Sequence, residues 1–292
     1  MNLAWNELNE NILHEKLIIN TKDKVALQMV EKLNNPIFTK KDLDEKSYYI
    51  KSGYGQKTVT AINKESRKKF PNKSFEDLSL KLSDTDIISY AYFLKETEYK
   101  NVFEKGHILF NSIKVQGFMA TNKAQRENVK ILSYENDDKF IIRLQLKDNN
   151  DHLILAKGYE TNNLQSLIKE INTFNKIELK SINTKDFFVA PIVKLSHFRE
   201  YKELINKSLL NKGFESYQIQ KMFENIKFDM DEKGARVENE AVIVLGKSFQ
   251  LDEEIPRKFI LDKPYWIIMK RIDSSNPYFI LGVNNTQLMT NL

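Results

Sequence analysis

The sequence predicts an α+β protein with several β-sheets, and three observations lead to this class. Apolar residues recur at helical spacing in the early part of the chain. From Ser83 onward, short segments rich in Ile and aromatic residues follow one another as strands do. No internal repeat and no clear linker divides the 292 residues, so we expect one mixed domain over 1–292 with more than one sheet.

The early part of the chain is expected to contain two helices. The segment 22–33 carries apolar residues at helical spacing, which predicts a helix with one core-facing stripe. The residues of this stripe are Val25, Ala26, Met29, Val30 and Leu33. The segment 57–70 predicts a second, more polar helix, and 47–51 between the two helices is expected to be a short strand.

The later part of the chain is expected to consist mainly of strands. They are predicted at 84–93, 107–120 (a pair with a turn), 128–134, 138–146, 152–159, 185–195, 226–233, 264–271 and 277–283. The segment KDNND at 147–151 predicts a hairpin turn. Helices are expected at 162–174, with Asn162 or Asn163 as cap, and at 198–214, where Gly213 is a stop signal.

Composition excludes several classes of protein. The chain contains no cysteine, which rules out disulfides, thiol chemistry and cysteine-based zinc sites. The acidic, amphipathic N-terminus lacks the features of a signal peptide. No apolar run approaches the ~18 residues that a membrane span needs. We therefore expect no membrane partner, and a protein that is cytoplasmic or secreted without a classical signal peptide.

The net charge of +5 is mild for a chain of this length. One dense basic run occurs at 64–73, and Glu65 interrupts it. A solvated helix face explains this run, and we expect no nucleic acid among the partners. The alternative is a binder of nucleic acid or of an acidic partner, whose affinity would fall steeply with added salt.

Motifs of known enzymes are missing from the sequence. The histidines, His14, His107, His152 and His197, lie far apart and none has a partner at metal-ligand spacing. Neither a glycine-rich phosphate loop nor the nucleophile pattern GxSxG occurs. We therefore expect no metal, no cofactor and no enzymatic activity.

The order of several motifs in the later part of the chain resembles that of the serpins. The matching positions are Tyr92-Phe93, Phe103, Pro191, Gly213, Asp231-Glu232-Lys233-Gly234, Phe259 with Pro264-Tyr265, and Phe279 with Gly282. The resemblance covers about residues 83–292. It implies a single serpin-like domain in which 1–82 is a reduced helical part and 83–292 is a strand-rich core, with an exposed reactive-centre loop at about 235–258.

The resemblance also implies how such a chain would act. In a serpin, a serine protease attacks the exposed loop and forms an acyl-enzyme with it. Cleavage then lets the loop insert as an extra strand into an existing sheet, which releases stored strain and distorts the protease before it can hydrolyse the ester. The implied partner is a serine protease, and we expect the inhibitor to be a monomer.

The loop sequence alternates as an inserting strand requires. The hinge residues implied by the resemblance are Glu232, Gly234, Ala235, Val237, Asn239 and Ala241. The last four of them would lie on the face that is buried on insertion. Asn239 would there need a partner or cost about 1–3 kcal/mol. Glu238 and Glu240, on the opposite face with Arg236 and Val242, could slow insertion.

The predicted reactive bond is Lys247-Ser248. A trypsin-like specificity pocket carries an aspartate that pairs with Lys or Arg, so the basic residue indicates a trypsin-like target. Counting from Gly234 in the register of the family places the cut after Ser248 instead, which would make this loop one residue short. The alternative is that Gly246 and Lys247 belong to an ordinary exposed loop.

Two departures from the family pattern leave two functions open. The positions where serpins carry an Asn and a His that control opening of the sheet are Ser89 and Glu224 in this sequence. The part before Ser83 is also shorter than the helical half of a serpin. We therefore expect either a shortened inhibitor of a serine endopeptidase or a non-inhibitory binding scaffold with a serpin fold.

Overall fold

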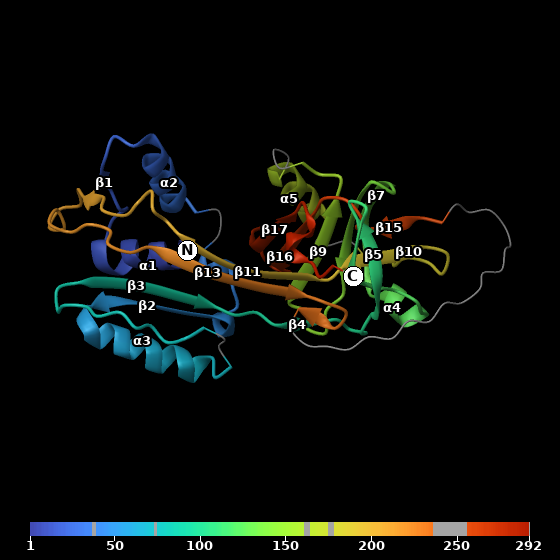
Figure 1. The fold of residues 1–292 in the computed structure, drawn as a ribbon, viewed down its shortest axis with the longest axis horizontal. Coiled ribbons are helices and arrows are strands. Elements are labelled where there is room, and N and C mark those ends of the chain that lie inside the picture. Colours follow the sequence, from blue (N-terminus) through green and yellow to red (C-terminus); the bar gives the residue numbers. More distant parts are fainter. Residues whose placement is uncertain (37–38, 73–74, 161–163, 175–177, 236–255, 292) are drawn as a thin grey trace. The chain divides into compact units, whose positions relative to one another are not determined.

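The computed structural model describes residues 1–36, 39–72, 75–160, 164–174, 178–235 and 256–291 (Figure 1). The chain forms two compact units. Unit 1 comprises Met1–Lys95 and His197–Ile226, and unit 2 comprises Glu96–Ser196 and Lys227–Leu292. The single domain expected over 1–292 remains a prediction.

Three α-helices of unit 1 begin the fold: α1 (Asn2–Leu8), α2 (Lys24–Asn34) and α3 (Gly55–Lys69). A π-helical turn, Asn9–Leu13, follows α1. The helices predicted at 22–33 and 57–70 are confirmed. The Asp23 side chain caps α2 by accepting hydrogen bonds from the backbone amides of Val25 and Ala26.

The core-facing stripe of α2 differs from the prediction. Ala26, Val30 and Leu33 are buried, as their i, i+4, i+7 spacing requires. Val25, predicted on the same stripe, is 56% exposed. Each residue turns the helix by about 100°, so Val25 cannot share the face of its neighbour Ala26.

Unit 1 also contains short β structure. Strands β2 (Tyr48–Tyr54) and β3 (Ile87–Phe93) form an antiparallel pair, which confirms the strands predicted at 47–51 and 84–93. Two shorter strands, β1 (Ile19–Asn20) and β12 (Ser208–Leu209), form a second antiparallel pair.

The helix predicted at 198–214 is absent, and this prediction is wrong. Strand β11 (Val193–Glu200) runs into the segment, and turns lead from there to β12. Tyr201 and Leu204 are buried in the core of unit 1, so their helix-like spacing comes from successive turns. Asn206 takes a left-handed conformation (φ 63°) that no helix continues through. Gly213, at φ +83°, lies in a later turn and ends no helix.

Unit 2 is built around two sheets. A five-stranded antiparallel sheet has the order β17-β16-β9-β8-β7. Its strands are β7 (Val129–Asn136), β8 (Lys139–Leu144), β9 (Asp151–Lys157), β16 (Tyr265–Arg271) and β17 (Pro277–Val283). A four-stranded sheet has the order β15-β10-β6-β5. Its strands are β5 (Glu104–Phe110), β6 (Ile113–Met119), β10 (Phe187–Pro191) and β15 (Lys258–Ile260).

These sheets confirm most of the predicted strands, including the pair at 107–120 with its turn at Asn111 and Ser112, both at positive φ. The strand predicted at 185–195 divides into β10 and β11. The strand predicted at 226–233 is β13 (Phe223–Met230), which begins three residues earlier and pairs with β11.

The core of unit 2 lies where side chains of both sheets meet. Phe140 of β8 and Phe259 of β15 lie in one cluster, with ring centroids 5.3 Å apart. The other face of the five-stranded sheet packs against α5 (Leu164–Thr173) through Leu167 and Ile171. This helix confirms the one predicted at 162–174, while its expected caps, Asn162 and Asn163, lie outside the described residues. No helix in the described ranges is long and apolar enough to cross a membrane.

Candidate functional site

The candidate site consists of the two chain segments that lead into and out of residues 236–255. The entering leg is 231–235, which follows β13 and ends in β14 (Gly234–Ala235). The leaving leg is 256–262, which contains β15. Both legs belong to unit 2, so the structure fixes their surroundings within one compact body.

The structure places only part of the predicted hinge and none of the reactive bond. Glu232, Gly234 and the backbone of Ala235 are described. The other predicted residues, Val237, Asn239, Ala241, Lys247 and Ser248, lie outside the described residues.

A tight turn forms the entering leg. The carboxylate oxygen Oδ1 of Asp231 accepts hydrogen bonds from the backbone amides of Lys233 (2.8 Å) and Gly234 (3.2 Å). The Asp231 amide donates to the carbonyl of Gly234 at 2.9 Å. Burial raises the pKa of Asp231 and nearby Glu232 raises it further, although the two amide hydrogen bonds favour the ionised form. The aspartate therefore fixes the shape of the leg through its own backbone.

Backbone pairing holds the entering leg against the start of unit 2. The Phe103 amide donates to the carbonyl of Glu232 (2.8 Å), and the Tyr99 amide donates to that of Lys233 (2.9 Å). Strand β14 pairs antiparallel with β4 (Thr97–Glu98). These hydrogen bonds make the entering leg one strand of a short antiparallel pair, held along one of its edges.

The side chain of Glu232 lies inside the protein. It is 4% exposed and forms an ion pair with Lys105 of β5, with Nζ 3.5 Å from Oε1. A buried carboxylate is costly unless a cation and hydrogen bonds compensate it. The sequence pointed to Glu232 through the family motif, but Lys105 carried no signal because its pairing depends on the fold.

Gly234 occupies a position that only glycine fits. Its φ of +151° lies in a region that side chains rarely adopt. A Cβ atom at this position would lie 2.2 Å from the carbonyl oxygen of Thr97 and 2.7 Å from the Cα of Glu98. The glycine thus allows β14 and β4 to approach each other closely.

Two buried hydroxyl groups lie in and next to β4, the strand that pairs with the entering leg. Within the described part of the chain, Thr97 Oγ1 and Tyr99 Oη have no partner. Burial raises the pKa of Tyr99 well above its usual value, and Asp231 adds to this effect. An unsatisfied buried polar group costs roughly 1–3 kcal/mol.

The leaving leg is held by a buried aspartate. Asp186, 2% exposed, accepts hydrogen bonds from Arg257 Nη2 (2.6 Å), Nε (3.1 Å) and backbone amide (3.2 Å). Burial alone raises the pKa of Asp186, but Arg257 and the amide of Asn183 outweigh it, and the pKa is lowered. Beyond Arg257, β15 runs parallel to β10.

A second buried charge holds the end of the leaving leg. Lys157, 2% exposed, donates from Nζ to Asp262 Oδ1 (2.6 Å), the carbonyl of Ile260 (3.0 Å) and the carbonyl of Asp137 (3.0 Å). Because each donor of the ammonium is engaged, the charge is compensated inside the protein. The only feature of the sequence that marks Lys157 is its place near the end of the apolar strand predicted at 152–159.

The two departures from the family pattern, Ser89 and Glu224, both contact the N-terminal helix region of unit 1. Ser89 Oγ donates to the carbonyl of Ala4 at 2.6 Å. Glu224 accepts from the hydroxyl of Tyr201 (2.6 Å) and from the amino group of Met1 (3.0 Å). Burial raises the pKa of Glu224, but the ammonium and Tyr201 outweigh it and the pKa is lowered. In this chain the two positions therefore serve to hold α1.

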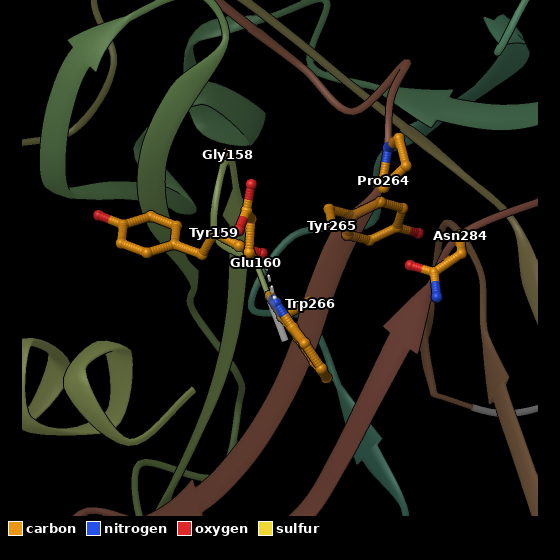
Figure 2. Close-up of a pocket in the computed structure, with 7 residues that line it drawn as sticks. All are labelled: Gly158, Tyr159, Glu160, Pro264, Tyr265, Trp266 and Asn284. Carbon is orange, nitrogen blue, oxygen red and sulfur yellow. Dashed lines mark hydrogen bonds between the residues drawn. The ribbon is translucent and has the colours of Figure 1, made fainter. Parts of the chain in front are cut away.

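A cavity of about 380 Å³ lies beside the five-stranded sheet (Figure 2). Tyr159 and Glu160 line it after the end of β9, and Tyr265 and Trp266 line it at the start of β16. The indole N–H of Trp266 donates a hydrogen bond to the carbonyl of Tyr159 at 2.8 Å. These two polar groups of the cavity wall are therefore already paired with each other. Among the described residues no group of three or more His, Cys, Asp or Glu side chains could hold a metal ion.

Comparison with known proteins shows a fold but no sequence relative. No family model matches the chain, and no curated protein matches its sequence. A highly specific serpin of the insect Tenebrio molitor matches 97% of this chain and 94% of its own, with a TM-score of 0.50 and 11% identity. Thyroxine-binding globulin in complex with thyroxine matches 96% of this chain and 95% of its own, with a TM-score of 0.48 and 11% identity.

The likeness to the insect protein shows that this chain has the serpin fold. The predicted α+β, serpin-like fold class is thereby confirmed. At 11% identity the match concerns the fold, and the activity has to be argued from this chain's own residues.

Substituting Gly234 by Ala is expected to lower the free energy of unfolding by about 2–4 kcal/mol, because the variant combines a strained backbone with a steric clash. Gly213→Ala is the matched control, since Gly213 has φ +83° but no atom within 4 Å of the added Cβ. That control should lose only about 1–2 kcal/mol. Denaturant unfolding of both variants measures the difference, and equal losses would contradict the close approach of β14 to β4.

Asp186→Asn is expected to lower the free energy of unfolding by about 1–3 kcal/mol at pH 7. The folded-state pKa of Asp186 lies below its ordinary value, so the carboxylate stabilises the fold above the unfolded pKa. This contribution is lost as the pH falls through the folded pKa, and wild type and variant should converge in acid. Asp273→Asn, at a 62% exposed carboxylate paired with Arg271, is the control and should change stability by less than about 1 kcal/mol. A pH-independent difference for Asp186→Asn would contradict this account.

Proposed function

We propose that the protein is a serpin-type inhibitor of a serine endopeptidase with trypsin-like specificity, and that Lys247-Ser248 is its reactive bond. The observation that carries the proposal is the arrangement of two fixed legs, on a serpin fold, around a basic bait segment. Fixed ends let a protease engage the segment between them. The proposed inhibitor is a monomer.

The chemistry begins as ordinary proteolysis. The serine Oγ of the protease attacks the carbonyl carbon of Lys247 and forms an ester, while Ser248 leaves with its amine as a new N-terminus. The segment that ends in the ester then remains joined to the entering leg, whereas Ser248 remains joined to the leaving leg. Inhibition requires that the freed segment adds to a sheet faster than water hydrolyses the ester.

Unpaired strand edges for such an addition exist in the structure. Among the described strands, β3 pairs only with β2, and β13 pairs only with β11. Each therefore has a second edge whose backbone groups have no strand partner there. Such edges are templates for an added strand. Because β13 leads directly into the entering leg, a strand that extends from Gly234 starts close to the end of β13.

Release of the entering leg would also expose a buried hydroxyl group that lies beneath it. For the segment after Gly234 to move, β14 must separate from β4. That separation breaks few backbone hydrogen bonds and exposes Thr97, whose buried hydroxyl has no partner in the described part of the chain. A freed hydroxyl can bind water, which offsets part of the cost of separation.

The contacts of the entering leg also favour a second function, that of a non-inhibitory scaffold. Backbone hydrogen bonds at Glu232 and Lys233, the pairing of β14 and the ion pair to Lys105 all hold the entering leg in place. If these contacts outlast cleavage, the segment is cut but does not insert. The protein would then be a non-inhibitory scaffold with a serpin fold that binds a partner.

Incubation with trypsin-like proteases separates the two functions. The inhibitor is expected to give a band on a denaturing gel that combines the protease with residues 1–247, because the ester survives denaturation. Lys247→Ala should abolish this band with trypsin-like enzymes, whereas Arg236→Ala, at the other basic residue early in the segment, should retain it. Cleavage after Lys247 without a joined band would overturn inhibition and leave the scaffold function.

A further inference from the structure

The cavity drawn in Figure 2 lies at one end of the five-stranded sheet in unit 2. Strand β16 runs antiparallel to both of its neighbours, so its first residues meet the last residues of β9 and β17. Tyr159 and Glu160 follow the end of β9. Trp266 lies at the start of β16, and Asn284 follows the end of β17. The topology thus gathers these four residues around a cavity of about 380 Å³, a size that suits a small organic molecule.

A glycine directs the chain from β9 into the wall of this cavity. Gly158 has φ +84°, a conformation that residues with a side chain rarely adopt. A Cβ atom at this position would lie 2.4 Å from the carbonyl oxygen of Asp138. The glycine therefore lets the chain turn sharply against the connection between β7 and β8, and the turn brings Tyr159 and Glu160 to the cavity.

The indole of Trp266 has a fixed position in the cavity wall. Its N–H donates to the carbonyl of Tyr159 at 2.8 Å. Its six-membered ring lies over Gly282 of β17, where an added Cβ would lie 3.0 Å from Cζ3 of the indole. Trp266 is only half-buried, so part of the ring remains accessible from the cavity that it lines. A ring that is already ordered lowers the entropic cost of binding a ligand.

The ring of Tyr159, the neighbouring aromatic residue, already has its partners. Its hydroxyl donates to the carboxylate of Glu170 at 3.2 Å, and the ammonium of Lys139 lies over the ring, 5.8 Å from the centroid. Within the described part of the chain, no cation lies over Trp266. Since tryptophan is the side chain whose ring face attracts cations best, Trp266 offers the cavity an unused surface for a positive charge.

Two polar side chains of the wall also lack partners. Among the described residues, neither the carboxylate of Glu160 nor the side-chain amide of Asn284 has a hydrogen bond or an ion pair. The basic residue that precedes β16, Lys263, is bound by Asp138 at 2.9 and 3.0 Å. In the view of Figure 2, Glu160 and Asn284 lie on either side of Trp266. The cavity therefore carries a negative charge that no described cation pairs with.

We propose that this cavity binds a small organic ammonium ion that carries an aromatic body. The carboxylate of Glu160 pairs with the ammonium group. The ring of Trp266 attracts the same charge and packs against the body of the ligand. The amide oxygen of Asn284 can accept one of the N–H groups. The site contains no residue of the proposed reactive loop, so it can be tested separately from inhibition.

Isothermal titration calorimetry with phenethylamine, phenylethanol and phenylpropionate tests the charge of the ligand, because the three compounds share one aromatic body. Phenethylamine is expected to bind at least about tenfold tighter than neutral phenylethanol, and anionic phenylpropionate should bind most weakly. Butylamine has the ammonium group without the ring, as a lysine side chain does, and should also bind at least about tenfold more weakly than phenethylamine. Affinity for phenethylamine no greater than for phenylethanol or butylamine would overturn the proposal.

Glu160→Gln tests whether the carboxylate selects the charge. The variant should bind phenethylamine about as weakly as phenylethanol, while its affinity for phenylethanol stays that of the wild type. Glu104→Gln is the matched control, at an exposed glutamate of β5 that does not line the cavity, and it should keep the wild-type affinities. If Glu160→Gln binds phenethylamine as tightly as the wild type, the proposal is wrong.

Tryptophan fluorescence shows whether the amine binds in this cavity. The chain contains two tryptophans, and the other one, Trp5, is buried in unit 1. Trp5→Phe therefore leaves Trp266 as the sole emitter, and phenethylamine should change its emission with the dissociation constant found by calorimetry. The wild-type emission gives the same readout if Trp5→Phe fails to fold. Calorimetric binding without a change in emission would place the amine elsewhere and overturn the proposal.

Discussion

The pairing of β14 with β4 limits what residues 236–255 can do. Any strand that grows from the entering leg must begin where this short pairing ends, at Gly234 and Ala235. Breaking it costs a few backbone hydrogen bonds, each contributing about 1 kcal/mol net. In the same region, the buried hydroxyls of Thr97 and Tyr99 have no hydrogen-bond partner among the described residues. Separation of β14 from β4, the first step that the proposed inhibitor needs and the scaffold lacks, therefore costs little free energy and takes place at one turn.

The strands and most helices were predictable because local periodicity reports burial. The apolar run in β9 and the helical spacing in α5 placed these elements within a few residues of their observed ends. The same reasoning failed at 198–214, where successive turns bury Tyr201 and Leu204 at the spacing of a helix. Periodicity cannot distinguish a helix from such a series of turns, because backbone hydrogen bonds to residues outside the segment, such as Ile219, decide its conformation.

The candidate site was predictable only where a motif marked it. Glu232 and Gly234 followed from the resemblance, and the structure explains both through burial and a close approach to Thr97. Lys105 and Asp186 escaped prediction because their roles come from contacts across more than 70 residues of sequence. Asp186 shows a buried charge with its partners in place.

Melting of the chain before and after cleavage at Lys247-Ser248 tests the central claim most directly. If the freed segment leaves β4 and adds to an unpaired strand edge, it gains backbone hydrogen bonds. The account predicts a large rise in the melting temperature of the cleaved chain. An unchanged or lower melting temperature after complete cleavage would contradict insertion, and the entering leg would then be a permanent part of a rigid scaffold.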